Sequence, residues 1–284
     1  AITRFLFPES DDALLKCQVE DGLTIEPEFY MPIIPMLLVN GADGIGTGYS
    51  SFVPNYNPRD IIANLRRVIA GDTQEPMTPF YRGFTGTITA KTAAKDTGNF
   101  DVCGVIDVKD EGTVHISELP LRTWTQNYKQ FLETLLDGTG GDDKKGAPKF
   151  KIKSFTENHT DTTVSFTVKL DPAELAKAQA TGLEKSFKLE GSISTQNMTC
   201  FDTKGRMKKY ESPQEIIDAF YDERMDCYDA RKKHMLAELT QQCTRLGNQM
   251  RFIREICSGE LVVSNRPKSE LLAELADKSY DTIA

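Results

Sequence analysis

Apolar side chains recur with helical spacing after Asn57. Asn57 is a favourable helix N-cap, and Pro58 suits the first helical turn. Gly71 marks the end of the pattern, which predicts a helix over residues 58–70. The apolar face of this helix comprises Ile61, Ile62, Leu65, Val68 and Ile69. Residues 1–30 predict a short helix and turns, with Asp11 or Asp12 capping a helical segment over residues 13–19.

From about residue 80 the pattern changes to short β-branched segments separated by glycine-containing turns, which is typical of strands. Strands are predicted over residues 83–89, 100–108, 113–117 and 162–170. Residues 137–149 are rich in glycine and charge and predict an exposed loop. A helix capped by Asp171 is expected to end near Gly182. Residues 187–201, with a turn at 204–205, return to strand and hairpin character.

The last quarter of the chain predicts long helices. Ser212-Pro213-Gln214-Glu215 forms a capping box with proline at the first helical position. Apolar residues then step by three and four as Leu236, Leu239, Cys243, Leu246, Met250, Ile253 and Cys257, which predicts a coiled-coil seam of about three heptads. Gly259 ends this pattern, and a second helix is expected from Arg266 through Leu275. A surface helix on a globular core is the alternative, and Gly247 favours it.

Composition places the chain among globular proteins. Of its 284 residues, 39% are hydrophobic and 27% are charged, and the formal net charge is −8. No apolar run reaches the length of a membrane helix. The six cysteines and three histidines lack metal-ligand or redox spacing, which indicates reduced thiols and no zinc site. Two basic clusters interrupt the acidic balance: Lys144, Lys145, Lys149, Lys151 and Lys153, and then Lys204, Arg206, Lys208 and Lys209.

An apolar run from Met31 leads into a loop with glycines at positions 41, 44, 46 and 48. Such spacing lets the backbone approach a ligand closely. No helix start follows the loop, so the pattern does not match a dinucleotide-binding fingerprint. The bulky apolar residue among the glycines, Ile45, has two interpretations: a wedge between stacked base pairs, or a side chain tucked into the core. Spacing alone favours the core.

Longer stretches add a resemblance to a known family. Residues 26–50 and 53–58 resemble the breakage-reunion region of eukaryotic type IIA DNA topoisomerase II, and so do residues 118–126, 159–164, 187–189, 208–210 and 220–224. The resemblance implies an α+β fold with three parts. These are the end of a winged-helix region with the DNA-intercalating loop (1–75), a mixed β tower domain (76–211) and a coiled-coil arm (212–284).

The resemblance also implies roles for particular residues. Ile45 matches the isoleucine that inserts between base pairs and bends DNA in this family, so with the resemblance the wedge becomes the preferred interpretation. Arg122 and Trp124 lie in a motif that contacts DNA, with a core aromatic as the alternative for Trp124. Residues 188–197 match a segment that touches flanking DNA, although Glu190 and Gly191 suit it less. Its expected phosphate-positioning donors are Lys188, Ser192, Ser194, Thr195 and Asn197.

The expected function is the DNA-binding and DNA-bending part of an ATP-dependent topoisomerase, which passes one duplex through a transient double-strand break. The family's nucleophilic tyrosine and metal site are expected upstream of residue 1, so no catalytic residue or metal ligand is assigned. ATP and Mg²⁺ are expected for the intact enzyme, as are double-stranded DNA and a second copy as partners, no membrane, and a nuclear location. The alternatives are a non-catalytic architectural DNA-binding module and a coiled-coil scaffold without DNA affinity.

Overall fold

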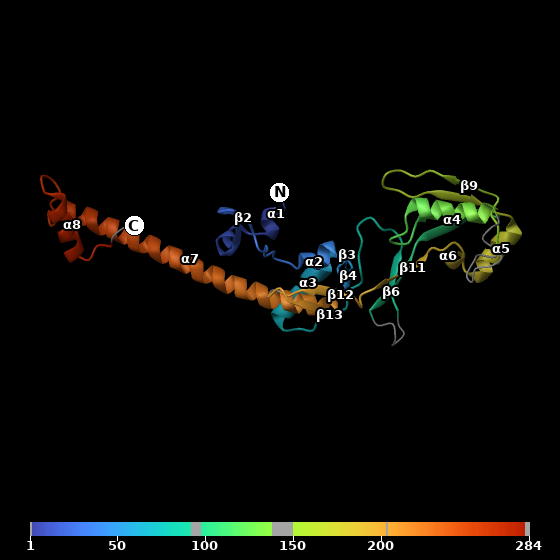
Figure 1. The fold of residues 1–284 in the computed structure, drawn as a ribbon, viewed down its shortest axis with the longest axis horizontal. Helices are drawn as coiled ribbons and strands as arrows, with labels where there is room; N and C mark the ends of the chain where they lie inside the picture. The colour runs from blue at the N-terminus through green and yellow to red at the C-terminus, as the bar shows by residue number, and fades with distance from the viewer. Residues whose placement is uncertain (1, 92–97, 138–149, 203, 282–284) are drawn as a thin grey trace. The chain divides into compact units, whose positions relative to one another are not determined.

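The computed structural model describes residues 2–91, 98–137, 150–202 and 204–281 (Figure 1). Helices and antiparallel strands alternate along the chain, which confirms the predicted α+β class. The chain divides into two compact units. One comprises Ala1–Ile33 with Asp222–Ala284, and the other is Ile34–Tyr221.

A four-stranded antiparallel sheet carries the largest core of the second unit. Its order is β7 (Val105–Asp110), β8 (Thr113–Glu118), β10 (Phe166–Lys169) and β9 (Ser154–Glu157). Apolar side chains of the sheet pack with those of α4 (Thr125–Asp137), α5 (Pro172–Thr181) and the residues around α6 (Leu183–Ser186). Tyr128 is buried in this core, and its hydroxyl donates a hydrogen bond to the carbonyl of Phe187 at 2.8 Å.

A three-stranded sheet follows the order β11 (Glu190–Ser194), β6 (Asn99–Cys103) and β5 (Thr87–Ala90). The single strand predicted over residues 100–108 is wrong, because Gly104 divides it between two sheets. The Gly104 N–H donates to the Leu189 carbonyl at 2.9 Å. A Cβ at this position would lie 2.4 Å from the carbonyl oxygen of Glu118, so only glycine permits this close approach.

The third core cluster joins helices and two hairpins. It contains α2 (Met36–Asn40), β3 (Ala42–Ile45), β4 (Ser50–Val53), α3 (Pro58–Ala70), β12 (Met198–Phe201), β13 (Met207–Tyr210) and the start of α7 (Pro213–Ser258). Helix α3 confirms the prediction, since the Asn57 side chain accepts a hydrogen bond from the Arg59 N–H at 3.0 Å. Ile61 and Leu65 are buried, but Ile69 is exposed, so the apolar face is narrower than predicted.

The helical segment predicted over residues 13–19 is wrong. Helix α1 (Thr3–Leu6) is followed by a 3-10 helix (Glu9–Leu14) and then by a hairpin of β1 (Cys17–Glu20) and β2 (Leu23–Pro27). Asp21 and Gly22, both with positive φ, connect the two strands. An Asp-Gly pair strongly favours such a hairpin turn, and this local preference outweighs the expected cap.

Of the two residues expected to cap α5 and α7, only the second makes a capping hydrogen bond. Asp171 occupies the N-cap position of α5, but its carboxylate pairs with Lys153 at 2.6 Å and makes no capping bond. Ser212 does cap α7, since its hydroxyl accepts from the Glu215 N–H at 3.3 Å. Most of the predicted exposed loop, residues 138–149, lies outside the described residues.

Helix α7 continues through Gly247 and is followed by α8 (Lys268–Asp277), as the capping and Gly259 signals predicted. All seven seam residues from Leu236 to Cys257 are exposed in this single chain. Arg251 joins α7 to the segment after α8, since its guanidinium donates to the Lys278 carbonyl at 3.0 Å and lies 3.8 Å from the centre of the Tyr280 ring.

Asp11 is buried in the first unit. Its carboxylate accepts hydrogen bonds from Arg224 at 2.8 Å and from Arg231 at 2.5 Å, and the Arg224 side chain is only 4% exposed. Removing one member of a buried ion pair leaves the other charge without compensation. This network therefore ties α7 to the segment that precedes β1.

We predict that Asp11→Asn lowers the free energy of unfolding by about 3–5 kcal/mol, because two guanidinium groups lose their carboxylate. Urea denaturation followed by circular dichroism measures the change. Asp12→Asn is the matched control, since the Asp12–Arg4 pair is exposed and its loss should cost about 0–1 kcal/mol. Equal effects of the two substitutions would contradict the prediction.

Candidate nucleic-acid interface

The β3–β4 hairpin places Ile45 at its tip. Ile45 is paired with Ser50 at the end of the ladder, and the Gly46 N–H closes the turn by donating to the Tyr49 carbonyl at 2.8 Å. Ile45 is 95% exposed. The interpretation of Ile45 as a core residue is therefore wrong.

One face of the hairpin carries Asp43 and Ile45, because alternate residues of a strand share a face. The guanidinium of Arg122 forms an ion pair with the Asp43 carboxylate and lies 4.4 Å from the centre of the Phe52 ring. Phe52 is the cross-strand partner of Asp43. Arg122 thus contacts both strands on the face that carries Ile45.

The glycines of the loop differ in what surrounds them. A Cβ at Gly46 would lie 2.5 Å from the Tyr49 ring, so a larger residue there would require this exposed ring to move. A Cβ at Gly44 would meet no other atom of the described residues within 4 Å, and the φ angle of Gly44 is not positive. The fold therefore gives no internal steric reason for glycine at position 44, which leaves its backbone open to close approach from outside.

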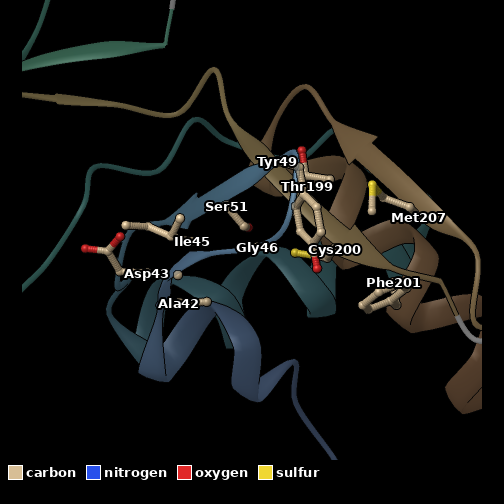
Figure 2. Close-up of a pocket in the computed structure, with 11 residues that line it drawn as sticks. Ala42, Asp43, Ile45, Gly46, Tyr49, Ser51, Thr199, Cys200, Phe201 and Met207 are labelled. Atoms are coloured by element: carbon tan, nitrogen blue, oxygen red, sulfur yellow. The ribbon is translucent and has the colours of Figure 1, made fainter.

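An open cavity of about 270 Å³ lies between the hairpin and the β12–β13 hairpin. Figure 2 shows Ile45 and Asp43 on one side of it and Tyr49, Thr199 and Met207 on the other. Burial raises the pKa of the Cys200 thiol in the cavity wall, while a hydrogen bond with Ser51 partly opposes the shift. The thiol therefore stays protonated at neutral pH.

Asn197 supports strand β4 of the hairpin. Its side-chain amide donates to the Ser50 hydroxyl at 2.7 Å, and its carbonyl accepts from the Phe52 N–H at 2.9 Å. Asn197 is half-buried. These two bonds hold the edge of β4, so the amide is already engaged within the protein.

Trp124 lies two residues after Arg122 and is 77% exposed, which excludes the alternative of a core aromatic. The backbone of Trp124 starts α4, since its carbonyl accepts from the Tyr128 N–H at 3.0 Å. An exposed indole ring beside an arginine provides a stacking surface and a hydrogen-bond donor.

The segment from Lys188 to Thr195 is uneven as a set of phosphate donors. Lys188 is exposed, with its ammonium group 4.4 Å from the centre of the Phe131 ring. Ser192 and Ser194 are exposed on β11, but Ser192 lies opposite Asp101 in the neighbouring strand. Thr195 is 3% exposed, and its hydroxyl donates to the Gly98 carbonyl at 2.8 Å. In this structure its hydroxyl is therefore not presented to solvent.

The second basic cluster separates into paired and available side chains. Arg206 pairs with Asp202 at 2.8 Å, and Lys208 pairs with Glu215 at 2.9 Å. Lys209 is exposed and lies opposite Thr199, a residue of the cavity wall. The sequence does not distinguish Lys209 from its basic neighbours, and only the strand register places it opposite the cavity wall. In the first cluster, Lys144, Lys145 and Lys149 lie outside the described residues.

Among the described residues, no group of three or more His, Cys, Asp or Glu side chains could hold a metal ion. Within the same part of the chain, no helix has the length and apolar character needed to cross a membrane. The described residues therefore present an exposed apolar tip with Arg122 contacting both strands of its hairpin, an exposed indole ring two residues after Arg122, and an exposed lysine opposite a residue of the cavity wall.

We predict that Cys200 is alkylated by iodoacetamide at least several-fold more slowly at pH 8 than the exposed Cys243, because burial restricts access and raises the pKa of Cys200. The rate at Cys200 should still rise with pH above this point as the thiolate forms. Peptide mass spectrometry after timed labelling measures both rates. Equal alkylation rates at the two cysteines would contradict the restricted access to Cys200.

Comparisons with known proteins place the chain in one family. The family model for the A subunits of DNA gyrase and topoisomerase IV matches residues 1–284. DNA topoisomerase 2 of Pisum sativum is 47% identical over 98% of this chain, and DNA topoisomerase 2-beta of Homo sapiens is 44% identical over 99%. The chain spans 18% and 17% of the length of these two relatives.

A solved structure is also similar along nearly the whole chain. It is described as the Plasmodium falciparum topoisomerase II DNA-binding, cleavage and re-ligation domain. The match has a TM-score of 0.82 and 40% sequence identity, and covers 98% of this chain and 36% of that one. The resemblance to topoisomerase II found in the sequence is confirmed, and the chain belongs to the family of DNA gyrase and topoisomerase IV A subunits.

Proposed function

We propose that this chain is the DNA-binding and DNA-bending part of an ATP-dependent type IIA topoisomerase, an isomerase that passes one duplex through a transient double-strand break in another. The observation that carries the proposal is Ile45, an apolar side chain held almost fully in solvent at the tip of a hairpin. An apolar side chain that lacks a place in the core is suited to insertion between base pairs.

The energetics require more than the wedge. Burying one isoleucine stabilises a complex by about 1.5–3 kcal/mol. Bending a duplex costs about 1–6 kcal/mol by elastic estimates, and unstacking one step adds about a few kcal/mol. Contacts with phosphates must supply the difference. Because the formal net charge is −8, these contacts depend on local groups rather than on an overall positive field.

The candidates for these contacts are exposed side chains of the described residues. Trp124, Lys188 and Ser194 present exposed side chains, and Lys209 is added by its register on β13. Ser192 is also exposed and lies opposite Asp101, whose carboxylate is paired with Lys91 at 3.1 Å. Buried Thr195 fits a structural role, in which it fixes the end of β11.

The chemistry of strand cleavage comes from outside this chain in our proposal. The nucleophilic tyrosine and the Mg²⁺ site belong to other parts of the enzyme, and ATP binds elsewhere in it. The chain holds the duplex in position for that reaction. We further propose the domain division 1–75, 76–211 and 212–284, with a winged-helix end, a tower and a coiled-coil arm, in an enzyme that acts as a nuclear homodimer. The exposed apolar seam of α7 supports an arm that pairs with another helix.

We predict that Ile45→Ala reduces DNA bending while leaving measurable binding, because truncation removes the wedge and retains the polar contacts. Energy transfer between dyes at the two ends of a short duplex, at saturating protein and low salt, reports the bend. Ile69→Ala on α3 is the matched control, since Ile69 is also exposed, at 68%, and lies outside the hairpin.

The energy-transfer measurement has three outcomes. Bending that is lost with Ile45→Ala and kept with Ile69→Ala supports the wedge. If both variants bend the duplex like the parent chain, Ile45 is not the wedge, and the bending must come from other groups such as Trp124. If the parent chain binds no DNA even at low salt, the proposed function of the isolated chain fails.

We predict that Lys209→Ala weakens DNA binding by a few-fold and lowers the slope of log affinity against log salt by about 0.9, the value for one lost phosphate contact. Fluorescence anisotropy titrations over a range of salt concentrations measure both quantities. Lys109→Ala is the control, because Lys109 is exposed on β7 beside Asp110 and Glu111. A salt slope that is unchanged by Lys209→Ala would remove Lys209 from the interface.

A further inference from the structure

We propose that Arg122 and Asp43 form a brace that keeps the β3–β4 hairpin rigid, which makes Arg122 a positioning residue for Ile45 rather than a contact to phosphate. This inference rests on the proposed function, because it assigns a role in wedge insertion. The brace consists of the Arg122 guanidinium, the Asp43 carboxylate and the Phe52 ring.

The contacts of Arg122 cross the hairpin from one strand to the other. Its ion pair reaches Asp43 on β3, and its flat guanidinium lies over the ring of Phe52 on β4. Asp43 and Phe52 are directly opposite each other in the ladder, and Asp43 is two residues from Ile45 on the same face. A planar guanidinium can stack and form an ion pair at the same time, which the ammonium group of lysine cannot do.

The backbone of Arg122 is held by a hydrogen-bonded turn and by the packing of the residue before it. The residue has φ +69, and the Thr123 N–H closes its turn by donating to the Pro120 carbonyl at 3.1 Å. The preceding residue, Leu121, packs against the apolar cluster of Phe100, Val102 and Ile193. A left-handed conformation is unfavourable for arginine and persists when the surroundings determine it. The guanidinium therefore extends from an anchored point.

The wedge needs this support because a two-stranded hairpin is marginally stable by itself. Asn197 holds the edge of β4 through Ser50 and the Phe52 N–H. Ile45, however, lies on β3. The Asp43–Arg122 pair links β3 to the anchored turn, so the strand that carries the wedge resists being pushed back when base pairs separate.

Phosphate contact is the competing role for Arg122, and the two roles differ in what Asp43 does. A phosphate group would compete with the Asp43 carboxylate for the exposed guanidinium, so removing the carboxylate would leave Arg122 free for phosphate and strengthen binding. In a brace, loss of either partner loosens the hairpin. Reversing both charges restores the ion pair of the brace without the stacking on Phe52, and it leaves no cation at position 122 to contact a phosphate.

Hydrogen–deuterium exchange of the free protein tests the brace without DNA. We expect Arg122→Ala and Asp43→Ala each to speed exchange in peptides covering residues 42–53 by about threefold or more, through easier local opening. Peptides covering the β12–β13 hairpin should not change. Arg59→Ala, at an exposed arginine on α3, is the matched control. Unchanged exchange in residues 42–53 would overturn the brace whether or not the chain bends DNA.

The doubly labelled duplex then connects the brace to bending. We expect Asp43→Arg and Arg122→Asp each to lose about half or more of the energy-transfer change at saturating protein, and the double variant D43R/R122D to recover part of it, because the ion pair returns without the stacking on Phe52. Stronger binding by Asp43→Asn, with no recovery in the double variant, would overturn the brace in favour of a phosphate contact. Failure of the proposed function is distinguishable, because the parent chain would then not bend the duplex while the exchange result still stood.

Discussion

The exposure of Ile45 is the constraint on which the surrounding structure depends. An apolar side chain that stays in water does not add to the stability of the fold. The hairpin that carries it has four ladder pairs and therefore little stability of its own. The surroundings compensate on two sides. Asn197 bonds to β4, and Arg122 bonds to β3 from a turn in which the partly buried Leu121 packs against a buried apolar cluster. The result is a stiff apolar tip instead of a flexible loop.

The cores of the second unit supply this stiffness. One cluster holds the base of the hairpin through α2, α3 and the start of α7. A smaller cluster lies beneath Arg122, and the largest packs α4 against the four-stranded sheet. Because protein interiors are close-packed, a side chain anchored in these clusters fixes the position of the exposed groups next to it. Trp124 at the start of α4 gains its place in the same way.

Much of the fold could be read from local signals. Asn57 and Gly71 bounded α3, Ser212 began α7, and alternating Phe166 and Val168 marked β10, because capping and periodicity act within a few residues. The failures involve long-range forces or a competing local signal. Gly104 divides one apparent strand between two sheets, since another strand's carbonyl crowds it. Asp11, expected as a cap, is instead buried against arginines more than 200 residues away.

The candidate site divides along the same line. The sequence by itself determined the glycine loop around Ile45, the basic clusters and the family resemblance, because these are carried by residue order. Only the tertiary structure decided which side chains are available for binding. It exposed Ile45 and Trp124, buried Thr195, paired Arg122 with Asp43 and left Lys209 beside the cavity. Exposure and pairing depend on residues that are distant in sequence and adjacent in space, so no local pattern records them.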